Sequence, residues 1–255
     1  MANLKIQSLS LQIESKILCR DLNVQIRENE RWGLLGKNGV GKTTLLHALI
    51  GQRRTNQGSI QLDGVSVYDL KQRELASKVG ILFQQGIEGL PATVFETVIL
   101  GRHPHTQSLL WDDPKDIQIA ENALAAFDLD QLKERAVDTL SGGELQRLAL
   151  AMLLAQTPQL FLLDEPSNHL DVAFQVKLLT VLTNKVADTS ASMIMATHDI
   201  NLAFRFCENI ILLLEDGESL AGKSVDVLTE ENLSQAYGCH IRSVNSGERR
   251  LFYPA

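Results

Sequence analysis

Apolar and polar residues alternate over the first part of the chain. Between residues 4 and 26, apolar side chains recur at near-alternate positions in two short runs, the spacing of strands with one buried face. An apolar run at 32–35 is followed by a glycine-rich turn and then by helical spacing over 42–50. This strand–loop–helix order is the unit of a parallel sheet. Further short apolar runs, typical of strands buried on both faces, lie at residues 81–83, 160–163, 193–196 and 210–214.

The pattern changes between Gln84 and Ser141. Prolines interrupt this stretch, and residues 116–127 have helical spacing. The sequence therefore predicts an α/β fold with a mainly parallel sheet, an N-terminal antiparallel β portion and a helical insert. We expect a single domain over residues 1–255, with a helical subdomain over residues 85–155 inserted within it.

Composition narrows the class of protein. The hydrophobic fraction of 44% and the charged fraction of 22% are ordinary for a soluble globular chain. A net charge of −7 gives no bulk attraction for a polyanion, so we expect no nucleic-acid partner. Three cysteines without CxxC spacing favour a reducing, cytosolic compartment. No apolar run approaches the roughly 18–20 residues that cross a bilayer, so any membrane role must come through a partner.

A glycine-rich loop follows the apolar run at 32–35. Residues 36–43 fit the phosphate-loop pattern G-x-x-x-x-G-K-[ST] in full. Backbone N–H groups of such a loop, and the start of the following helix, surround phosphate oxygens. Lys42 is expected to reach the β- and γ-phosphates of ATP, and the Thr43 hydroxyl to ligate magnesium. The alternative is a chance glycine-rich turn. The nucleotide-binding set is Gly36, Lys37, Asn38, Gly39, Val40, Gly41, Lys42, Thr43 and Thr44.

Two acids end a later apolar strand, in the order Leu163-Asp164-Glu165. Asp164 is expected to hold magnesium through water, as the second acid of phosphate-loop sites does. Glu165 is expected to act as the general base that accepts a proton from the attacking water. By itself this pattern is more simply a strand that leads into a solvated turn. Downstream of a phosphate loop, the catalytic interpretation is favoured.

A second anion-binding feature lies at residues 140–147, Leu-Ser-Gly-Gly-Glu-Leu-Gln-Arg. Ser141, Gly142 and Gly143 open a helix, and a helix start with serine and glycine attracts anions. Because one phosphate-loop ATPase needs only one such site, a second one suggests a γ-phosphate held from two sides. Here the chain resembles the ATP-binding-cassette (ABC) family, in which the LSGGQ signature of one subunit closes on ATP held by the other. Glu144 replaces the commoner Gln, a variant found in importer ATPases.

The resemblance covers nearly the whole chain and implies further site residues. It makes Gln84 the Q-loop residue, a catalytic residue and magnesium ligand, Asp171 part of the D-loop, and His198 the switch histidine. The alternatives are that Gln84 merely caps a strand and that His198 is structural. Ile13 stands where the family often stacks an aromatic on adenine. An isoleucine still covers the base but gives up ring stacking of about 1 kcal/mol.

Residues 93–105 look like the TV…V…LGR-x-PH stretch of ATPases serving importers of iron chelates, haem and cobalamin, and residues 228–238 are similar to the same group. His103 and His105 flank Pro104, but two metal ligands without a third or fourth make a weak metal site.

Rival functions are a soluble ABC-type ATPase outside transport, an exporter cassette, and a phosphate-loop kinase. The kinase would lack the segment at Ser141, and exporters usually fuse the cassette to membrane helices.

The resemblance implies two copies that sandwich two ATP molecules with magnesium. It also implies integral membrane permease subunits, an external solute-binding protein reached through them, and a peripheral location on the cytoplasmic face of the inner (plasma) membrane. Residues 86–105 hold more apolar side chains than one short helix needs, so some are expected to form an exposed patch that docks the permease. The alternative is that all of them pack inside the insert. The side chains in question are Leu90, Val94, Phe95, Val98, Ile99 and Leu100.

Overall fold

The computed structural model describes residues 3–83, 90–106, 113–168, 170–247 and 249–255. Its centre is a six-stranded sheet in which every neighbouring pair is parallel except the pair at one edge, β10–β9. The predicted parallel sheet is therefore confirmed. In spatial order its strands are β10 (Ser219–Lys223), β9 (Asn209–Leu213), β3 (Arg31–Leu35), β8 (Ser192–Ala196), β7 (Leu160–Asp164) and β6 (Val79–Leu82).

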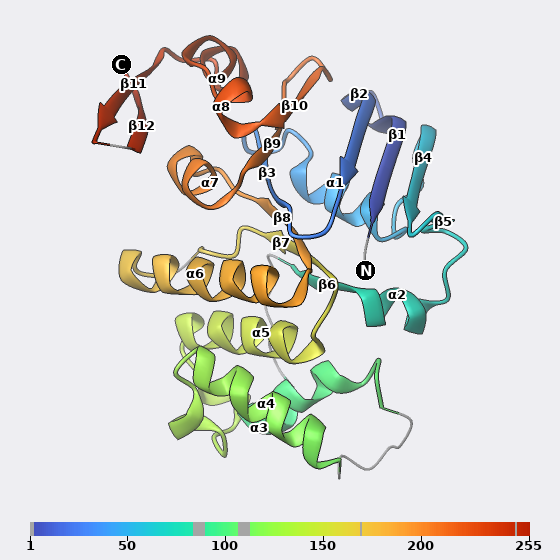
Figure 1. Ribbon diagram of the computed structural model, residues 1–255, viewed down its shortest axis with the longest axis vertical. Helices are drawn as coiled ribbons and strands as arrows, with labels where there is room; N and C mark the ends of the chain where they lie inside the picture. Colours follow the sequence, from blue (N-terminus) through green and yellow to red (C-terminus); the bar gives the residue numbers. More distant parts are fainter. Residues whose placement is uncertain (1–2, 84–89, 107–112, 169, 248) are drawn as a thin grey trace.

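The N-terminal part forms a separate antiparallel sheet, as the alternating pattern predicts. Its apolar face packs toward the parallel sheet, and helix α1 (Lys42–Leu49) fills the space between them (Figure 1). In spatial order its strands are β2 (Lys16–Ile26), β1 (Leu4–Ile13), β4 (Gln57–Leu62) and β5 (Val65–Ser66). Helix α2 (Gln72–Lys78) leads from this sheet into β6.

The central strands are buried on both faces, which explains their continuous apolar runs. Along β7, Leu160 and Leu162 face the core shared with the antiparallel sheet. Phe161 and Leu163 face a second core, built with the helices on the other side. Because successive side chains of a strand point to opposite faces, this one strand links the two cores.

Helices cover the second face of the parallel sheet and extend below it (Figure 1). Helix α5 contacts β6, α6 lies next to α5 in this view, and α3 and α4 pack against α5 on the side away from α6. The predicted helix at 116–127 is present as α4. The elements between β6 and β7 are α3 (Val94–Ile99), η1 (Leu100–Arg102), α4 (Pro114–Ala126), η2 (Asp130–Leu132), η3 (Val137–Thr139) and α5 (Gly142–Gln156).

The remaining elements follow β7 in the chain. A small hairpin closes the C-terminus beside α7 and α9 (Figure 1). None of the helices in the described part of the chain combines the length and hydropathy that spanning a bilayer requires. The elements not yet given are α6 (Val172–Thr189), α7 (Ile200–Phe206), α8 (Ser224–Val227), α9 (Glu230–Tyr237), β11 (Ile241–Ser246) and β12 (Arg249–Pro254).

Of the six apolar side chains from which an exposed patch was expected, three cannot belong to it. Val94, Val98 and Ile99 are buried in the core that α3 shares with α4 and α5. Leu100, just beyond α3, is 41% exposed, and Leu90 and Phe95 are half-buried. The physical reason is that α3 is only six residues long. So short a helix is stable only when packing supports it, and α3 uses its apolar residues for that purpose.

Candidate functional site

Three neighbouring strands deliver the predicted catalytic residues to one edge of the parallel sheet. The spatial order β3–β8–β7 brings together the loop after Leu35, His198 after β8, and Glu165 after β7. Ligands of open α/β sheets bind at the carboxyl ends of the strands. A cavity of about 520 Å³ opens here, lined by Ile13, Glu14, Ser15, Lys16, Leu18, Asn38, Gly39, Gly41, Lys42, Thr43, Thr44, Glu165, Asn168 and His198.

The loop over residues 36–41 needs its glycines for conformation and for space. Gly36 has φ 143° and Gly41 has φ 124°, a region that residues with a side chain rarely adopt. A Cβ at Gly36 would lie 2.8 Å from the carbonyl oxygen of Leu213, and one at Gly41 would lie 2.9 Å from Leu18. A Cβ at Gly39 would meet nothing within 4 Å. The loop is thus held closely from behind and is open at its tip, as a cradle for phosphate requires.

Lys42 is a buried cation in this loop. Its side chain is 7% exposed, and its Nζ lies 2.9 Å from the carbonyl oxygen of Gly36 and 3.9 Å from Oε1 of Glu165. Burial lowers the pKa of Lys42, and the negative charges of Glu165 and Asp164 oppose that shift. Because water screens this charge less than it would a surface charge, the ammonium group attracts phosphate oxygens strongly.

Glu165 sits at the centre of the site with a strained backbone. It is 7% exposed and has φ 50°, the left-handed region that residues other than glycine seldom occupy. Its N–H donates to the carbonyl oxygen of Ala196 at 2.9 Å, which ties β7 to β8 here. One carboxylate oxygen lies 2.8 Å from Nδ1 of the exposed His198, and the other faces Lys42. Strain of this kind concentrates at functional sites.

The residues present fit a magnesium ion beside phosphate. Oδ2 of Asp164 is buried and has no hydrogen-bond partner among the described residues, a costly arrangement for a carboxylate unless a cation satisfies it. The exposed Thr43 is at the start of α1 and lines the cavity. Carboxylate and hydroxyl oxygens are suitable ligands for magnesium. Gln84, the third expected ligand, lies outside the described residues.

The segment at 141–144 starts helix α5, as predicted, but none of its residues lines this cavity. Ser141 is the N-cap of α5, and its hydroxyl accepts from the backbone N–H of Glu144. Asp171 likewise caps α6, accepting from the N–H of Phe174 at 2.9 Å. Both residues therefore have local hydrogen-bonding roles in addition to any role at a nucleotide.

The structure adds two residues that sequence reasoning missed. Lys16 donates from its Nζ to the carbonyl oxygen of Gly39 at 2.6 Å and lines the cavity beside Ile13. The hydroxyl of Tyr237, at the end of α9, is buried and lacks a well-formed hydrogen bond among the described residues. Burial raises the pKa of Tyr237 to about 12, while the backbone N–H of Gly36 offsets part of that effect. No motif marks either residue, because both reach the loop from distant parts of the chain.

Two histidines considered as metal ligands lie elsewhere. Pro104 separates His103 from His105, and Nε2 of His105 is 2.8 Å from the carbonyl oxygen of Gln156. The described residues contain no group of three or more His, Cys, Asp or Glu side chains suited to a metal. His105 instead fastens the segment after α3 to the end of α5.

Comparison with known proteins identifies the family of this chain. The model of a family described as ABC transporter matches residues 19–168. The petrobactin import ATP-binding protein FpuD of Bacillus anthracis is 35% identical over 230 residues, covering 89% of this chain and 84% of the relative. The hemin import ATP-binding protein HmuV of Gloeobacter violaceus is 35% identical over 242 residues, covering 92% of this chain and 87% of the relative.

Solved structures of ABC transporter proteins have the same fold. An inward-facing metal-chelate type ABC transporter superposes with a TM-score of 0.84 at 26% identity, covering 100% of this chain and 98% of that chain. A dimeric bacterial ABC transporter cassette superposes with a TM-score of 0.75 at 28% identity, covering 87% of this chain and 98% of that chain.

Proposed function

This chain belongs to the ABC transporter family, and on that premise we propose that it drives import of a metal chelate (an iron–siderophore complex or haem) or of cobalamin. It is an ATP-binding subunit that hydrolyses ATP. The observation that carries the proposal is the buried Glu165 carboxylate, which lies between Lys42 of the phosphate loop and His198. The resemblance to import ATPases over nearly the full chain supports the direction of transport.

Within this site, Glu165 accepts the proton of the water that attacks the γ-phosphate. His198 holds one carboxylate oxygen through Nδ1 and so orients the base, while Lys42 faces both the carboxylate and the phosphate loop. The loop glycines and Thr44 bind phosphate, and Ile13, which lines the same cavity, covers the base.

Magnesium is part of the proposal, with Asp164 and Thr43 as its protein-side ligands and Gln84 as a third. When bound, it supplies positive charge that offsets the charge on the phosphate oxygens. The buried, unpartnered Oδ2 of Asp164 supports this assignment.

The site needs a second copy to be complete. Residues 141–144 and Asp171 lie outside the cavity of their own chain, so we assign them to ATP held by the partner copy. As an ABC transporter subunit the chain dimerises and works with membrane permease subunits. An external solute-binding protein and attachment at the cytoplasmic face of the plasma membrane complete the proposal. Residues 85–155 act in it as a helical subdomain of a single domain over 1–255, linking the nucleotide site to the permease.

The test is Glu165→Gln, which keeps the size of the side chain and removes the base. We expect ATP binding to remain, steady-state ATPase activity to fall at least about 100-fold, and ATP to hold the variant as a dimer in size-exclusion chromatography. Glu231→Gln, an exposed change on α9, is the matched control and should behave as wild type. Near-wild-type turnover of Glu165→Gln would remove this residue from the role of base.

The cargo is tested separately in cells. Deleting the gene should abolish uptake of one labelled substrate among a ferric siderophore, haem and cobalamin. Unchanged uptake of all three, or accumulation instead of loss, would favour an ABC-type ATPase outside import or an exporter cassette.

A further inference from the structure

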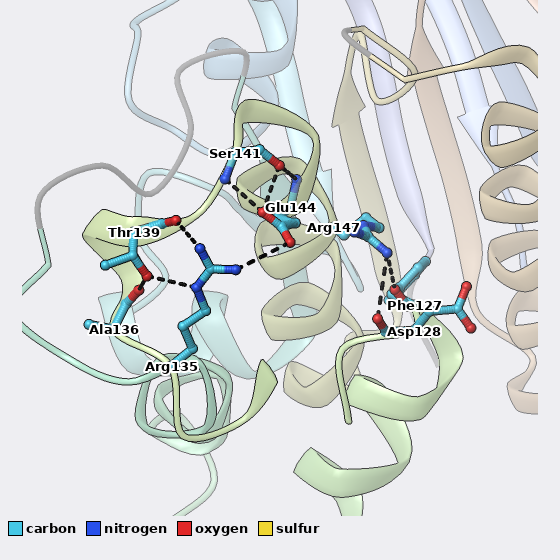
Figure 2. Close-up of polar contacts among 8 residues, drawn as sticks. All are labelled: Phe127, Asp128, Arg135, Ala136, Thr139, Ser141, Glu144 and Arg147. Atoms are coloured by element: carbon cyan, nitrogen blue, oxygen red, sulfur yellow. Dashed lines mark hydrogen bonds and ion pairs between the residues drawn. The ribbon is translucent and has the colours of Figure 1, made fainter. Parts of the chain in front are cut away.

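The start of helix α5 is a closed group of polar contacts (Figure 2). The hydroxyl and the backbone N–H of Ser141 both donate to Oε2 of Glu144, each at 2.7 Å. The other oxygen, Oε1, lies 3.7 Å from Nη1 of Arg135. The hydrogen bonds from Ser141 lower the pKa of Glu144, and the charges of Arg135 and Arg147 add to this effect. Glu144 is therefore a held carboxylate anion.

Arg135 is itself fixed by the turn that enters α5. Its Nε donates to Oγ1 of Thr139 at 2.9 Å, and its Nη2 donates to the carbonyl oxygen of the same residue at 2.6 Å. These bonds direct the remaining Nη1 toward Glu144. Arg147, on the other side of Glu144 in Figure 2, instead donates to the carbonyl oxygens of Phe127 and Asp128. Among the residues drawn in Figure 2, Arg135 is thus the cation that faces the Glu144 carboxylate.

A carboxylate at this place creates an electrostatic problem. On the proposed function, the N-terminus of α5 faces the γ-phosphate of ATP held by the second copy. Like charges at close range repel, and the repulsion grows when closure of the two copies removes water. A glutamine at this position would carry no such charge. With Glu144 the chain needs a nearby cation, and it needs that cation to keep the carboxylate turned away from the phosphate.

We propose that Arg135 is a positioning residue for ATP hydrolysis, which neutralises Glu144 and holds it against the N-cap, so that the carboxylate stays turned away from the phosphate that the start of α5 faces. The proposal rests on the two-copy site described above. Arg135 is 44% exposed and Glu144 is 19% exposed, and partly exposed ion pairs contribute little to folding. The role that we assign to this ion pair is therefore in the assembled site.

The experiment compares four proteins for ATPase rate at saturating ATP and for nucleotide affinity of the single chain. Arg135→Ala should lower kcat about 10-fold, a change of about 1.4 kcal/mol, with nucleotide affinity unchanged, because Arg135 does not line the phosphate cavity. Glu144→Gln in the Arg135→Ala background should restore kcat to within about 3-fold of wild type, since Gln keeps the N3 capping contact without the charge. Lys133→Ala, which removes an exposed cation two residues away, is the control and should leave kcat unchanged.

The rescue separates charge compensation from bracing of the turn. If Arg135 served only to brace Thr139, Glu144→Gln would restore nothing, and that result would overturn the proposal. Wild-type turnover in Arg135→Ala would overturn it as well. If Arg135→Ala proves unfolded by thermal melting, Arg135→Gln, which can still donate to Thr139, replaces it in the same comparison. A wild-type protein without ATPase activity would refute the proposed function itself, which distinguishes the two failures.

Discussion

Arg102 offers a sharp test of how the helical part of the protein is held together. Its guanidinium, 8% exposed, links η1 to α4 and to the end of α5. Nε donates to Oδ1 of Asp116 in α4 at 2.7 Å, and Nη1 donates at 2.7 Å to the carbonyl oxygen of Ala155 in α5 and at 2.9 Å to Oγ1 of Thr157. The carboxylate of Asp116 is only 13% exposed. Arg102→Ala would therefore leave a largely buried anion and a buried carbonyl without their partner.

The magnitude follows from burial. Removing one partner of a buried ion pair costs about 3–5 kcal/mol, and we expect Arg102→Ala to destabilise the protein by that amount. Urea unfolding followed by circular dichroism measures it as a lower midpoint at an unchanged slope. Replacing both charges, with Arg102→Met and Asp116→Leu together, should recover most of the loss, because no uncompensated charge remains.

A control and a refuting result complete the test. Lys133→Ala breaks a pair with Glu121 whose side chains are 47% and 46% exposed, and it should cost no more than about 0.5 kcal/mol. A loss below about 1 kcal/mol for Arg102→Ala, or a double variant as unstable as the single one, would show that this pair does not hold the helices as its burial implies.

Two further predictions concern buried groups. Burial raises the pKa of Cys19 to about 11 and that of Cys207 to about 12, whereas Cys239 is exposed. A thiol reagent at pH 8 should therefore label only Cys239 in the folded protein. Cys239→Ser should abolish that labelling. Burial also raises the pKa of Tyr237 to about 12, whereas tyrosines of an unfolded chain titrate near 10. The unfolded chain therefore loses this proton at a lower pH than the folded chain does. The contribution of Tyr237 to stability is present below about pH 10 and is lost as the pH rises toward 12. Tyr237→Phe should escape that loss, about 1.4 kcal/mol per pH unit, in urea unfolding at pH 9 and pH 11, and parallel losses in both proteins would contradict it.

Much of the fold could be predicted because local patterns determine it. The alternation in β1 and β2 reflects one buried face, and the apolar run of β7 reflects two. The loop at 36–41 is recognisable because its backbone angles demand glycine. The position of the two acids at the end of β7, close to the phosphate loop, could be predicted because neighbouring parallel strands end at the same edge of the sheet.

What could not be predicted depends on contacts between distant segments. Apolar residues at Val94 and Ile99 indicate burial or an interface equally well, and only the position of α5 against α3 decides between them. Arg135 belongs to no motif, and only the folded turn, in which Thr139 holds its guanidinium, places it beside Glu144. The hydroxyl of Tyr237 reaches Gly36 from the other end of the chain, which periodicity cannot reveal.

The two ends of helix α5 make different contacts with the rest of the protein. Gln156, at its C-terminal end, donates from its side-chain amide to the carbonyl oxygens of Ala76 and Val79, at the junction of α2 and β6. Close beside it, a Cβ at Gly101 would overlap the carbonyl oxygen of Met152, so η1 and α5 touch backbone to backbone.

The C-terminal end of α5 is therefore fixed to both the sheet and the segment after α3. Ser141 itself is held by contacts with Glu144 and the approach turn, and further along the helix Gln146 donates to the carbonyl oxygen of Pro166 and Arg147 to those of Phe127 and Asp128. A helix of 15 residues is about 22 Å long. A rotation of about 10° at the fixed end would displace Ser141 by about 4 Å, on that length. A push on the segment around Leu100, the exposed apolar residue beside η1, acts close to the fixed end. If a partner pushed there, a rotation of this size would carry the movement to the residues proposed to face the second nucleotide.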